Sequence, residues 1–350
     1  MPSKIRKLFV YGTLLQGEIR GGNLGDCQLI LALELPGRLY NTGRGYPAAV
    51  FDKSSKTKVH GELYALPENA ENKLKELDEI EGVSSGLYVR KAIKFQGQEF
   101  YFYEAGALLQ RIIKEENLIK SGSWRRYGSV ALSNPIRFAL NFEVEHSKRY
   151  GEFPPDNFPH FVFQRGDIPV LVTAPHATRH VRMGKPKYEE EYTGAVALLL
   201  HILTGCHALY THYASKIDPN YYDNSPFKVG LEEVVKKFNI RFALDLHGTI
   251  SRSKHDIYPG IGNEEEFLLG NGIYFKKLEG LAKSNGLNLG GKEVFSASRQ
   301  NTVTKFVAKK LRTPAIQLEI SGRLRKPEVD KESFMKLVEF LRLLIESVKT

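Results

Sequence analysis

Three short segments of the chain place reactive side chains at the ends of apolar, strand-like runs. They are Pro175-His176-Ala177, Asp245-Leu246-His247 and Gln317-Leu318-Glu319, and a further carboxylate, Glu190, opens a helix-like stretch after the first of them. Imidazole nitrogens and carboxylate oxygens are the usual ligands of a hydrolytic zinc ion, which keeps one position open for water and lowers the pKa of that water. This placement predicts a metal site built from distant parts of the chain, although a lone histidine is more often structural.

The elements that would position these side chains alternate between strands and helices from about residue 138 onward. The pattern predicts strands at 169–174, 207–213, 242–246 and 315–320, and helices at 189–203, 231–238, 276–283, 303–311 and 331–348. Such alternation is typical of an α/β fold with a largely parallel central sheet. Sites in these sheets form at the carboxyl ends of the strands, where His176, His247 and Glu319 would meet.

Two features near the N-terminus could carry a different chemistry. Tyr11-Gly12-Thr13-Leu14 follows a strand-like run, and a glycine there lets backbone N–H groups converge on a carboxylate. Glu81 stands at the end of a helix-like stretch, next to Gly82. A carboxylate at a helix C-terminus faces the negative end of the helix dipole, and desolvation would raise its pKa further, which suits a general acid/base. The alternative is a solvated acidic helix end.

The elements around these N-terminal features are mostly strands. We predict strands at 8–11, 28–40, 48–51, 58–66, 88–95 and 99–103, with one helix at 70–80. Many short strands with a single helix predict a small α+β, barrel-like sheet. Around residues 129–135 the pattern changes from mostly strands to alternating strands and helices. We therefore expect two domains, 1–128 and 129–350.

Composition narrows the class of protein. The 350 residues are 42% hydrophobic and 26% charged, and no segment has the uninterrupted apolar length needed to cross a bilayer. Only two cysteines occur, Cys27 and Cys206, which excludes a disulfide framework and a CxxC zinc site. The formal net charge of +10 comes from basic residues dispersed among acidic ones, which favours a small anionic substrate over nucleic acid. Because no apolar signal core follows the first residues, we expect a cytoplasmic protein without a membrane partner.

Five motifs in the first third of the chain follow one another in a recognisable order. They are Tyr11-Gly12-Thr13-Leu14, Pro36-Gly37-Arg38-Leu39-Tyr40, Val59-His60-Gly61-Glu62-Leu63-Tyr64, Leu77-Asp78-Glu79-Ile80-Glu81-Gly82 and Ser121-Gly122-Ser123-Trp124-Arg125. In this order they resemble the γ-glutamylcyclotransferase-like family. The resemblance implies that Glu81 is the acid/base and that the backbone of Tyr11, Gly12, Thr13 and Leu14 holds the substrate α-carboxylate. It also implies a reaction without a cofactor, in which the α-amine of a γ-glutamyl group attacks its own γ-amide carbonyl and releases 5-oxoproline and an amine.

The motifs of the remaining two thirds resemble a second family. A Pro-His-small strand end, an acid at the start of a helix, an Asp-x-His strand end and a late glutamate followed by arginine are similar to the N-formylglutamate amidohydrolase family and its relatives in the zinc-carboxypeptidase-like superfamily. The resemblance implies that His176, Glu190 and His247 bind Zn²⁺ and that Glu319 is the general base. It further implies that Arg323 or Arg325 grips a substrate carboxylate.

Several alternatives remain open at this point. No HxxE motif follows the first histidine, so Glu189 or Glu191 could replace Glu190 as the acidic ligand, and His180 could be an alternative ligand. Two polar loops, at 255–256 and 299–302, either line a pocket or are ordinary surface. The combined prediction is a two-module enzyme for small anionic glutamyl amides. The rival is a sensor that binds a glutamyl metabolite without turnover in one or both modules, and the oligomeric state is not predicted.

Overall fold

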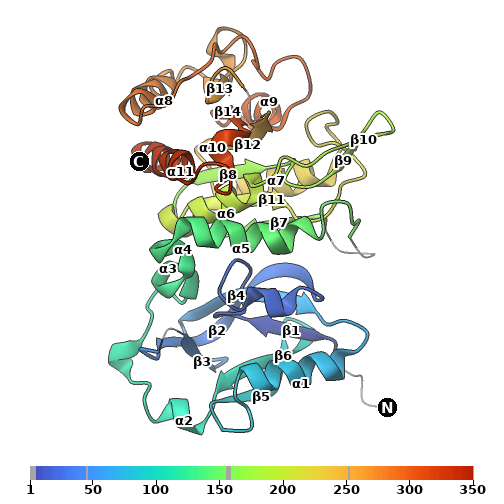
Figure 1. The fold of residues 1–350 in the computed structure, drawn as a ribbon, viewed down its shortest axis with the longest axis vertical. Coiled ribbons are helices and arrows are strands. Elements are labelled where there is room, and N and C mark those ends of the chain that lie inside the picture. The colour runs from blue at the N-terminus through green and yellow to red at the C-terminus, as the bar shows by residue number, and fades with distance from the viewer. Residues whose placement is uncertain (1–4, 45, 155–158, 251–252, 350) are drawn as a thin grey trace. The chain divides into compact units, whose positions relative to one another are not determined.

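The computed structural model describes residues 5–44, 46–154, 159–250 and 253–349, and the chain divides into two compact units, Met1–Asn134 and Pro135–Thr350. Each unit has its own sheet (Figure 1). The segment 129–134, which the sequence places in the second domain, falls in the first unit. Here Ser129 caps the short helix α4 (Val130–Ser133), and the amide of Val130 donates to the side chain of Glu18 at 3.3 Å. No helix of the described residues is both long and apolar enough to cross a bilayer.

The first unit is a curled six-stranded sheet. Its strands are β1 (Lys7–Val10), β2 (Gln28–Asn41), β3 (Pro47–Phe51), β4 (Lys58–Ala65), β5 (Tyr88–Phe95) and β6 (Gln98–Ala105). They lie in the order β3-β2-β4-β1-β6-β5, with β1 and β6 parallel and the other neighbours antiparallel. The curl brings β3 to β6, where the amide of Phe51 donates to Glu104 at 2.9 Å. This confirms the predicted barrel-like sheet.

The end of helix α1 (Ala70–Ile80) is fixed by a Schellman motif, which holds Glu81 in place. The amide of Gly82 donates to Glu79 and that of Val83 to Asp78, while Gly82 takes the left-handed φ of 63° that glycine adopts without strain. On the other side of Glu81, Leu77 is fully buried against the sheet. Glu81 is therefore the helix cap residue, held between a buried turn of helix and a reversing chain.

The second unit is built on a mixed, mostly parallel sheet. Its strands are β7 (Phe161–Gln164), β8 (Val170–Ala174), β11 (His207–Thr211), β12 (Phe242–Thr249), β13 (Ile257–Gly260) and β14 (Ala315–Ser321). The order is β13-β14-β12-β8-β11-β7, in which the four inner strands are parallel and the two edge strands antiparallel. The predicted α/β class with a largely parallel central sheet is confirmed.

Helices cover this sheet and supply its core. They are α5 (Pro135–Ser147), α6 (Thr193–Thr204), α7 (Pro226–Lys237), α8 (Ile273–Ser284), α9 (Val303–Lys309), α10 (Gly322–Arg325) and α11 (Lys331–Val348). Apolar side chains of α7 and α9 pack with one set of strand residues, including Leu171, Leu209 and Ala243. Helix α6 is buried almost throughout, between the sheet and its neighbours α5 and α11. Such packing fixes the strand ends that carry the polar residues.

The second unit differs from the sequence expectation in a few elements. Helix α6 begins at Thr193 and not at residue 189, because Tyr192 adopts a left-handed φ of 65° that a continuous helix does not allow. Helix α7 begins five residues earlier than predicted, at Pro226, where the Ser225 side chain accepts from the amide of Lys228. Helix α5, the two antiparallel edge strands and the hairpin of β9 (His180–Arg182) and β10 (Lys185–Lys187) were not predicted.

Candidate functional sites

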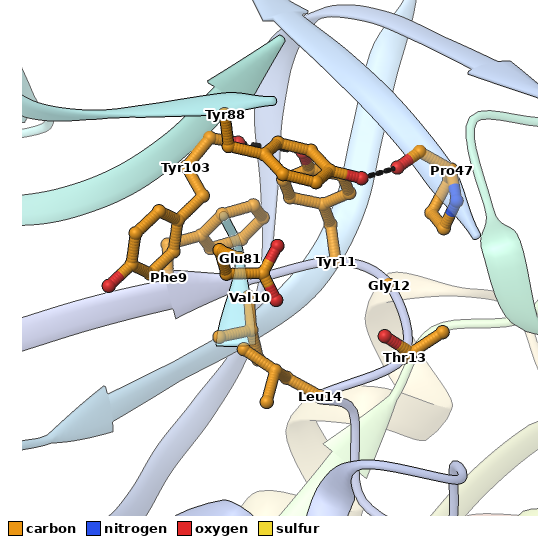
Figure 2. Close-up of a pocket in the computed structure, with 10 residues that line it drawn as sticks. All are labelled: Phe9, Val10, Tyr11, Gly12, Thr13, Leu14, Pro47, Glu81, Tyr88 and Tyr103. Atoms are coloured by element: carbon orange, nitrogen blue, oxygen red, sulfur yellow. Dashed lines mark hydrogen bonds between the residues drawn. The ribbon is translucent and has the colours of Figure 1, made fainter. Parts of the chain in front are cut away.

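A pocket of about 310 Å³, partly open to solvent, lies where β1 ends in the first unit. Figure 2 shows the carboxyl group of Glu81 turned into this space, beside the rings of Tyr11 and Tyr88. The pocket thus brings Glu81 together with the segment Tyr11-Gly12-Thr13-Leu14. The residues that line it are Phe9, Val10, Tyr11, Gly12, Thr13, Leu14, Pro47, Glu81, Tyr88 and Tyr103.

The phenol groups around Glu81 are committed to structural hydrogen bonds. The Tyr11 hydroxyl donates to the carbonyl of Tyr103 at 2.6 Å, and the Tyr88 hydroxyl donates to the carbonyl of Pro47. The Tyr103 hydroxyl donates to Asp78 at 2.8 Å. Because burial raises the pKa of all three phenols, they remain protonated and cannot serve as bases. Glu81 is therefore the one pocket-lining side chain with a pKa suited to proton transfer near neutral pH.

Glu81 has a strongly perturbed carboxyl group. It is 8% exposed, and burial raises its pKa to about 7, although the Arg20 guanidinium acts in the opposite direction. Arg20 is held nearby because its guanidinium donates to the carbonyl of Ile80, the last residue of α1, at 3.2 Å. A carboxyl group with this pKa can accept and return a proton near neutral pH.

The opposite wall of the pocket presents backbone donors. The carbonyls of Gly12 and Thr13 accept from the amides of Leu15 and Arg20, which turns the chain tightly after β1. The amides of Gly12, Thr13 and Leu14 donate to no acceptor within the described residues. A Cβ at Gly12 would lie 2.9 Å from Cγ of Pro47, so only glycine fits here without displacing the pocket wall. Three consecutive free N–H groups form a binding place for an anion such as a carboxylate.

In the second unit, Glu190 bridges the two predicted histidines. One carboxylate oxygen lies 2.9 Å from Nδ1 of His176, and the other lies 3.0 Å from Nδ1 of His247. The amide of Gly248 also donates to Glu190, at 3.0 Å. The two imidazole nitrogens and one carboxylate oxygen lie within 4.8 Å of one another, which is compatible with a shared metal ion.

The parallel sheet explains why distant residues converge. His247 and Glu319 are register partners on the adjacent strands β12 and β14, and His176 follows the end of β8 by two residues. Glu190 is tied to the same strand end, because its amide donates to the carbonyl of His176 at 2.8 Å. Glu319 lines the same pocket as the two histidines and Glu190. The site therefore lies at the carboxyl edge of the sheet.

The other ring nitrogen of each histidine faces a carboxylate. Nε2 of His176 lies 2.9 Å from Asp218, and Nε2 of His247 lies 3.2 Å from Asp245. Asp245 is itself held by the hydroxyls of Thr173 at 2.6 Å and Thr304 at 3.0 Å. Such outer carboxylates orient metal-binding imidazoles and raise their basicity. The arrangement leaves both Nδ1 atoms directed at Glu190, where an ion would bind.

A second group of possible ligands shares His176 but fits a metal less well. His176, His180 and Asp218 also present ligand atoms within 4.8 Å of one another. However, the Arg182 guanidinium already lies 2.5 Å from Asp218 and supplies a positive charge there. The ring of His180 stacks on that of His176 with centroids 3.9 Å apart. The geometry therefore favours the ligand set of His176, Glu190 and His247.

The neighbours of Glu190 are engaged elsewhere. Glu189 forms an ion pair with Arg179 at 2.8 Å, and Glu191 forms one with Lys326. Of the three consecutive glutamates, only Glu190 is hydrogen-bonded to the histidines within the described part of the chain. Glu190 is therefore the glutamate of the three that lies between the two histidines, and its role as the acidic ligand stays a prediction.

Glu319 and the two predicted arginines occupy different surroundings. Burial raises the pKa of Glu319 to about 7, although the nearby His247 acts against this. Arg323 pairs with Asp256 at 2.5 Å, and Arg325 donates to backbone carbonyls, including that of Thr249 at 2.8 Å. Neither arginine is among the described residues that line the pocket. Arg325 instead packs against Gly248, where an added Cβ would lie 2.6 Å from the guanidinium carbon.

Sequence reasoning missed several residues of this pocket, which encloses about 840 Å³ with part of it open to solvent. Asn220 and Arg182 lie in a loop and a hairpin without a motif of their own. Arg299, Gln300 and Thr302 belong to a polar loop for which the sequence left a pocket role open. The residues that line the pocket are His176, Arg182, Glu190, Asn220, His247, Val294, Phe295, Ser296, Ala297, Arg299, Gln300, Thr302, Gln317 and Glu319.

Comparisons with known proteins found one family model and several solved structures that match parts of the chain. Residues 8–126 match the family described as Gamma-glutamyl cyclotransferase, AIG2-like, and form a domain of that family. An AIG2-like protein from Mus musculus is 20% identical over 35% of this chain and 90% of its own, with a TM-score of 0.29. The N-formylglutamate amidohydrolase from Ralstonia eutropha JMP134 is 14% identical over 54% of this chain and 96% of its own, with a TM-score of 0.42. A bacteriophage poly-gamma-glutamate hydrolase is 14% identical over 54% of this chain and 89% of its own, with a TM-score of 0.38. No curated protein sequence matches the chain.

Proposed function

We propose that the protein is a two-module enzyme for glutamyl amides. The first unit would convert a γ-glutamyl amine into 5-oxoproline and a free amine, and the second would hydrolyse the amide bond of an N-acylglutamate-like or γ-glutamyl substrate with the help of a metal ion. Small anionic substrates agree with the net charge of +10. Location in the cytoplasm stays a prediction from the sequence.

The observation that carries the first activity is the pairing of Glu81 with the free amides of Gly12, Thr13 and Leu14 in one pocket. The amides would hold the substrate α-carboxylate, which places the adjacent α-amine near Glu81. Glu81 takes a proton from the α-ammonium, the nitrogen forms a bond to the γ-carbonyl carbon, and the γ-amide C–N bond breaks. Glu81 then returns the proton to the leaving nitrogen, which also receives the second proton that the new ring nitrogen loses and departs as an ammonium. Holding both reacting groups in one small pocket supplies much of the rate enhancement.

The observation that carries the second activity is Glu190 between the Nδ1 atoms of His176 and His247. These three residues would hold the ion, and Asp218 and Asp245 would orient the two imidazoles. When bound, a zinc ion would act as a Lewis acid toward the scissile carbonyl and lower the pKa of a water molecule. Glu319, with its pKa near 7, would take the proton of the attacking water and pass it to the leaving nitrogen. The glutamyl character of this substrate follows from the sequence resemblance.

The first activity is tested with a matched pair of variants. Glu81→Gln should lower 5-oxoproline release from γ-glutamyl amines by about 100-fold or more, since a positioned acid/base contributes 10²–10⁴-fold. Glu79→Gln removes an exposed carboxylate two residues away and should leave the rate unchanged. Product formation is measured by chromatography and folding by thermal melting. An active Glu81→Gln protein would remove Glu81 from the mechanism.

The second activity is tested by chelation of the intact protein. Removing the metal should abolish amide hydrolysis and leave 5-oxoproline formation unchanged, because Glu81 is the single carboxylate among the residues that line the first pocket, and no histidine or cysteine accompanies it there. Metal content is measured by mass spectrometry before and after chelation, and re-addition of Zn²⁺ should restore hydrolysis. If purified protein with its metal binds glutamyl ligands in both pockets but releases no product, the sensor alternative holds instead.

A further inference from the structure

The chain turns back on itself after β1, and the backbone of Arg20 closes this turn. The amide of Arg20 donates to the carbonyl of Thr13 at 2.9 Å. In a planar trans peptide, the C=O of one residue and the N–H of the next point in opposite directions. The contact with Thr13 therefore fixes the peptide between Thr13 and Leu14, whose free N–H group belongs to the anion-binding wall of the first pocket.

The side chain of Arg20 reaches the segment that carries Glu81. Its guanidinium donates to the carbonyl of Ile80 at 3.2 Å, and Ile80 is the last residue of α1, directly before Glu81. The last carbonyls of a helix lack intrahelical donors and form the negative end of the helix dipole, so a cation stabilises them. The last turn of α1, which the structure describes in full, contains no basic residue. Arg20 supplies this positive charge from a different segment.

The guanidinium of Arg20 has no carboxylate partner of its own. It forms no ion pair within the described part of the chain, and the carbonyl of Ile80 that it contacts is neutral. Burial raises the pKa of Glu81 to about 7, and the charge of Arg20 acts against this because it favours the ionised carboxylate. The charge of Arg20 thus acts on the carboxyl group that would take up the substrate proton.

Among the described residues, Arg20 is the cation that acts on Glu81, because the other titratable groups nearby are paired, solvated or neutral. Asp78, on the preceding turn of α1, pairs with Arg90 at 3.3 Å, and Glu79 is exposed to solvent. The phenols that face Glu81 from three other segments stay protonated, since burial raises their pKa values. They are Tyr11 after β1, Tyr88 on β5 and Tyr103 on β6.

We propose that Arg20 sets both the geometry and the charge of the first pocket. Its backbone holds the anion-binding turn, its guanidinium ties this turn to the end of α1, and its positive charge favours the carboxylate that Glu81 must form to accept a proton. The proposal rests on the proposed cyclotransferase function of this pocket. Arg20 is a positioning residue, since it acts through Glu81 and the turn and is not among the residues that line the pocket.

The test compares Arg20→Gln and Arg20→Lys with the unmodified, intact protein. A glutamine side chain has no charge and is too short to reach the Ile80 carbonyl, whereas a lysine side chain keeps the charge and can donate to it. Arg20→Gln should move the midpoint of the kcat/KM profile for 5-oxoproline formation from about 7 upward by roughly one pH unit, the smaller end of the usual effect of a nearby opposite charge. Arg20→Lys should bring the midpoint back to that of the unmodified protein.

A purely structural role of Arg20 predicts a different result. A loss of folding would lower kcat/KM by the same factor at every pH and leave the midpoint in place. Arg20→Gln should instead lose about tenfold more at pH 6 than at pH 9, with KM little changed, because the backbone amide of residue 20 still holds the turn. Arg6→Gln is the matched control: the exposed Arg6 also donates to a backbone carbonyl of this unit, that of Pro67 at 2.8 Å, and is absent from the residues that line the pocket. Its profile should equal that of the unmodified protein.

Two results would overturn the role of Arg20 while leaving the cyclotransferase intact. One is a midpoint that Arg20→Gln does not move, and the other is a midpoint that Arg20→Lys moves as far as Arg20→Gln. If the protein forms no 5-oxoproline from a panel of γ-glutamyl amines, the carboxyl ¹³C signal of Glu81, identified by its absence in Glu81→Gln, is titrated by NMR in place of the rate. An upward shift of its midpoint in Arg20→Gln but not in Arg20→Lys supports the placement of the charge and rejects the cyclotransferase, whereas no shift rejects both.

Discussion

The imidazole rings of His176 and His247 meet edge to face with their centroids 4.8 Å apart, although 71 positions separate them in the chain. Each turns Nδ1 to the same carboxylate, Glu190, and Nε2 to an aspartate of its own. Burial lowers the pKa of His176, but the charge of Glu190 and the contact with Asp218 more than reverse this and raise it to about 9. The cluster therefore attracts positive charge, as a metal-binding group must.

The choice between the two ligand groups gives the first prediction. His176→Ala and Glu190→Gln should each lose the bound metal, because either change removes a ligand of the favoured set. His180→Phe is the matched control: it keeps a ring stacked on His176 but removes the nitrogen that faces Asp218 at 3.5 Å. This variant should keep one metal ion per chain by mass spectrometry. Metal lost in His180→Phe but retained in Glu190→Gln would assign the ion to the other group.

Much of this cluster could be predicted because its signals are local. An apolar run that ends at a polar residue predicts the end of a strand, and both His176 and His247 follow this pattern. Parallel strands then bring their carboxyl ends together. The same holds for the first unit, where the turn after β1 and the end of α1 both carry glycines. In each case, a short run of sequence defines both the element and the residue at its end.

The partners of these residues could not be predicted, because tertiary packing selects them. Asp218 and Asn220 lie in a loop between β11 and α7, and nothing in their spacing shows that they reach His176 and His247. For Arg323 and Arg325 the sequence predicted a role in the pocket, but tertiary packing gives both side chains other partners. Arg323 and Arg325 follow β14 and resemble a substrate-binding pair, but the short helix α10 directs them to an aspartate and to backbone carbonyls.

The pH dependence of cyclisation follows from Glu81. The residue must be ionised to accept a proton from the substrate ammonium, and burial raises its pKa to about 7. The value of kcat/KM for 5-oxoproline formation should therefore rise with pH through about 7 and fall about tenfold for each unit below it. Initial rates between pH 5 and 8 at low substrate concentration measure this. A profile that is already flat at pH 5 would show that Glu81 ionises as an ordinary carboxylate.

The same carboxyl group should destabilise the first unit at high pH. Its folded-state pKa of about 7 exceeds the usual value near 4.5, so the folded state binds the proton more tightly between these pH values. The contribution of Glu81 to the stability of the first unit is therefore retained below about pH 4.5 and lost as pH rises through about 7. Relative to the unmodified protein, Glu81→Gln should gain up to roughly 3 kcal/mol between pH 5 and pH 8.

The protein contains one natural probe for this measurement. Its single tryptophan, Trp124, is buried in the first unit, so tryptophan fluorescence during urea unfolding reports on that unit. Glu79→Gln, which removes an exposed carboxylate, should follow the unmodified protein at both pH values. Equal pH dependence in the Glu81→Gln and unmodified proteins would contradict the raised pKa.

The pair His146 and His212 of the second unit should show the opposite pH dependence, because both imidazoles are buried in the neutral form. His212 is 1% exposed, and neither of its ring nitrogens has a hydrogen-bond partner among the described residues. It stacks on His146, whose Nε2 lies 3.1 Å from the carbonyl of Thr211. Burial lowers the pKa of both imidazoles, to about 3 for His146 and well below the usual value for His212. Protonation of either ring in the folded state would place an unpaired charge in the core.

Acid should therefore weaken the packing around His146 and His212 at pH values where an ordinary carboxylate is still ionised. The unfolded chain binds protons at these histidines below about pH 6.5, whereas the folded state does not, so stability present above pH 6.5 is lost as pH falls toward 3. Each histidine should contribute a loss of roughly 2 kcal/mol between pH 6.5 and pH 5. His212→Phe keeps an aromatic ring against His146 and removes one titrating group, so it should reduce this pH dependence by about half of the pair's contribution.

Hydrogen exchange of β11 and the residues after it, measured by mass spectrometry with a chelator present, reports the opening free energy without a contribution from metal release. An unchanged pH dependence in His212→Phe would show that a water molecule or a rearranged partner solvates this ring in the folded protein.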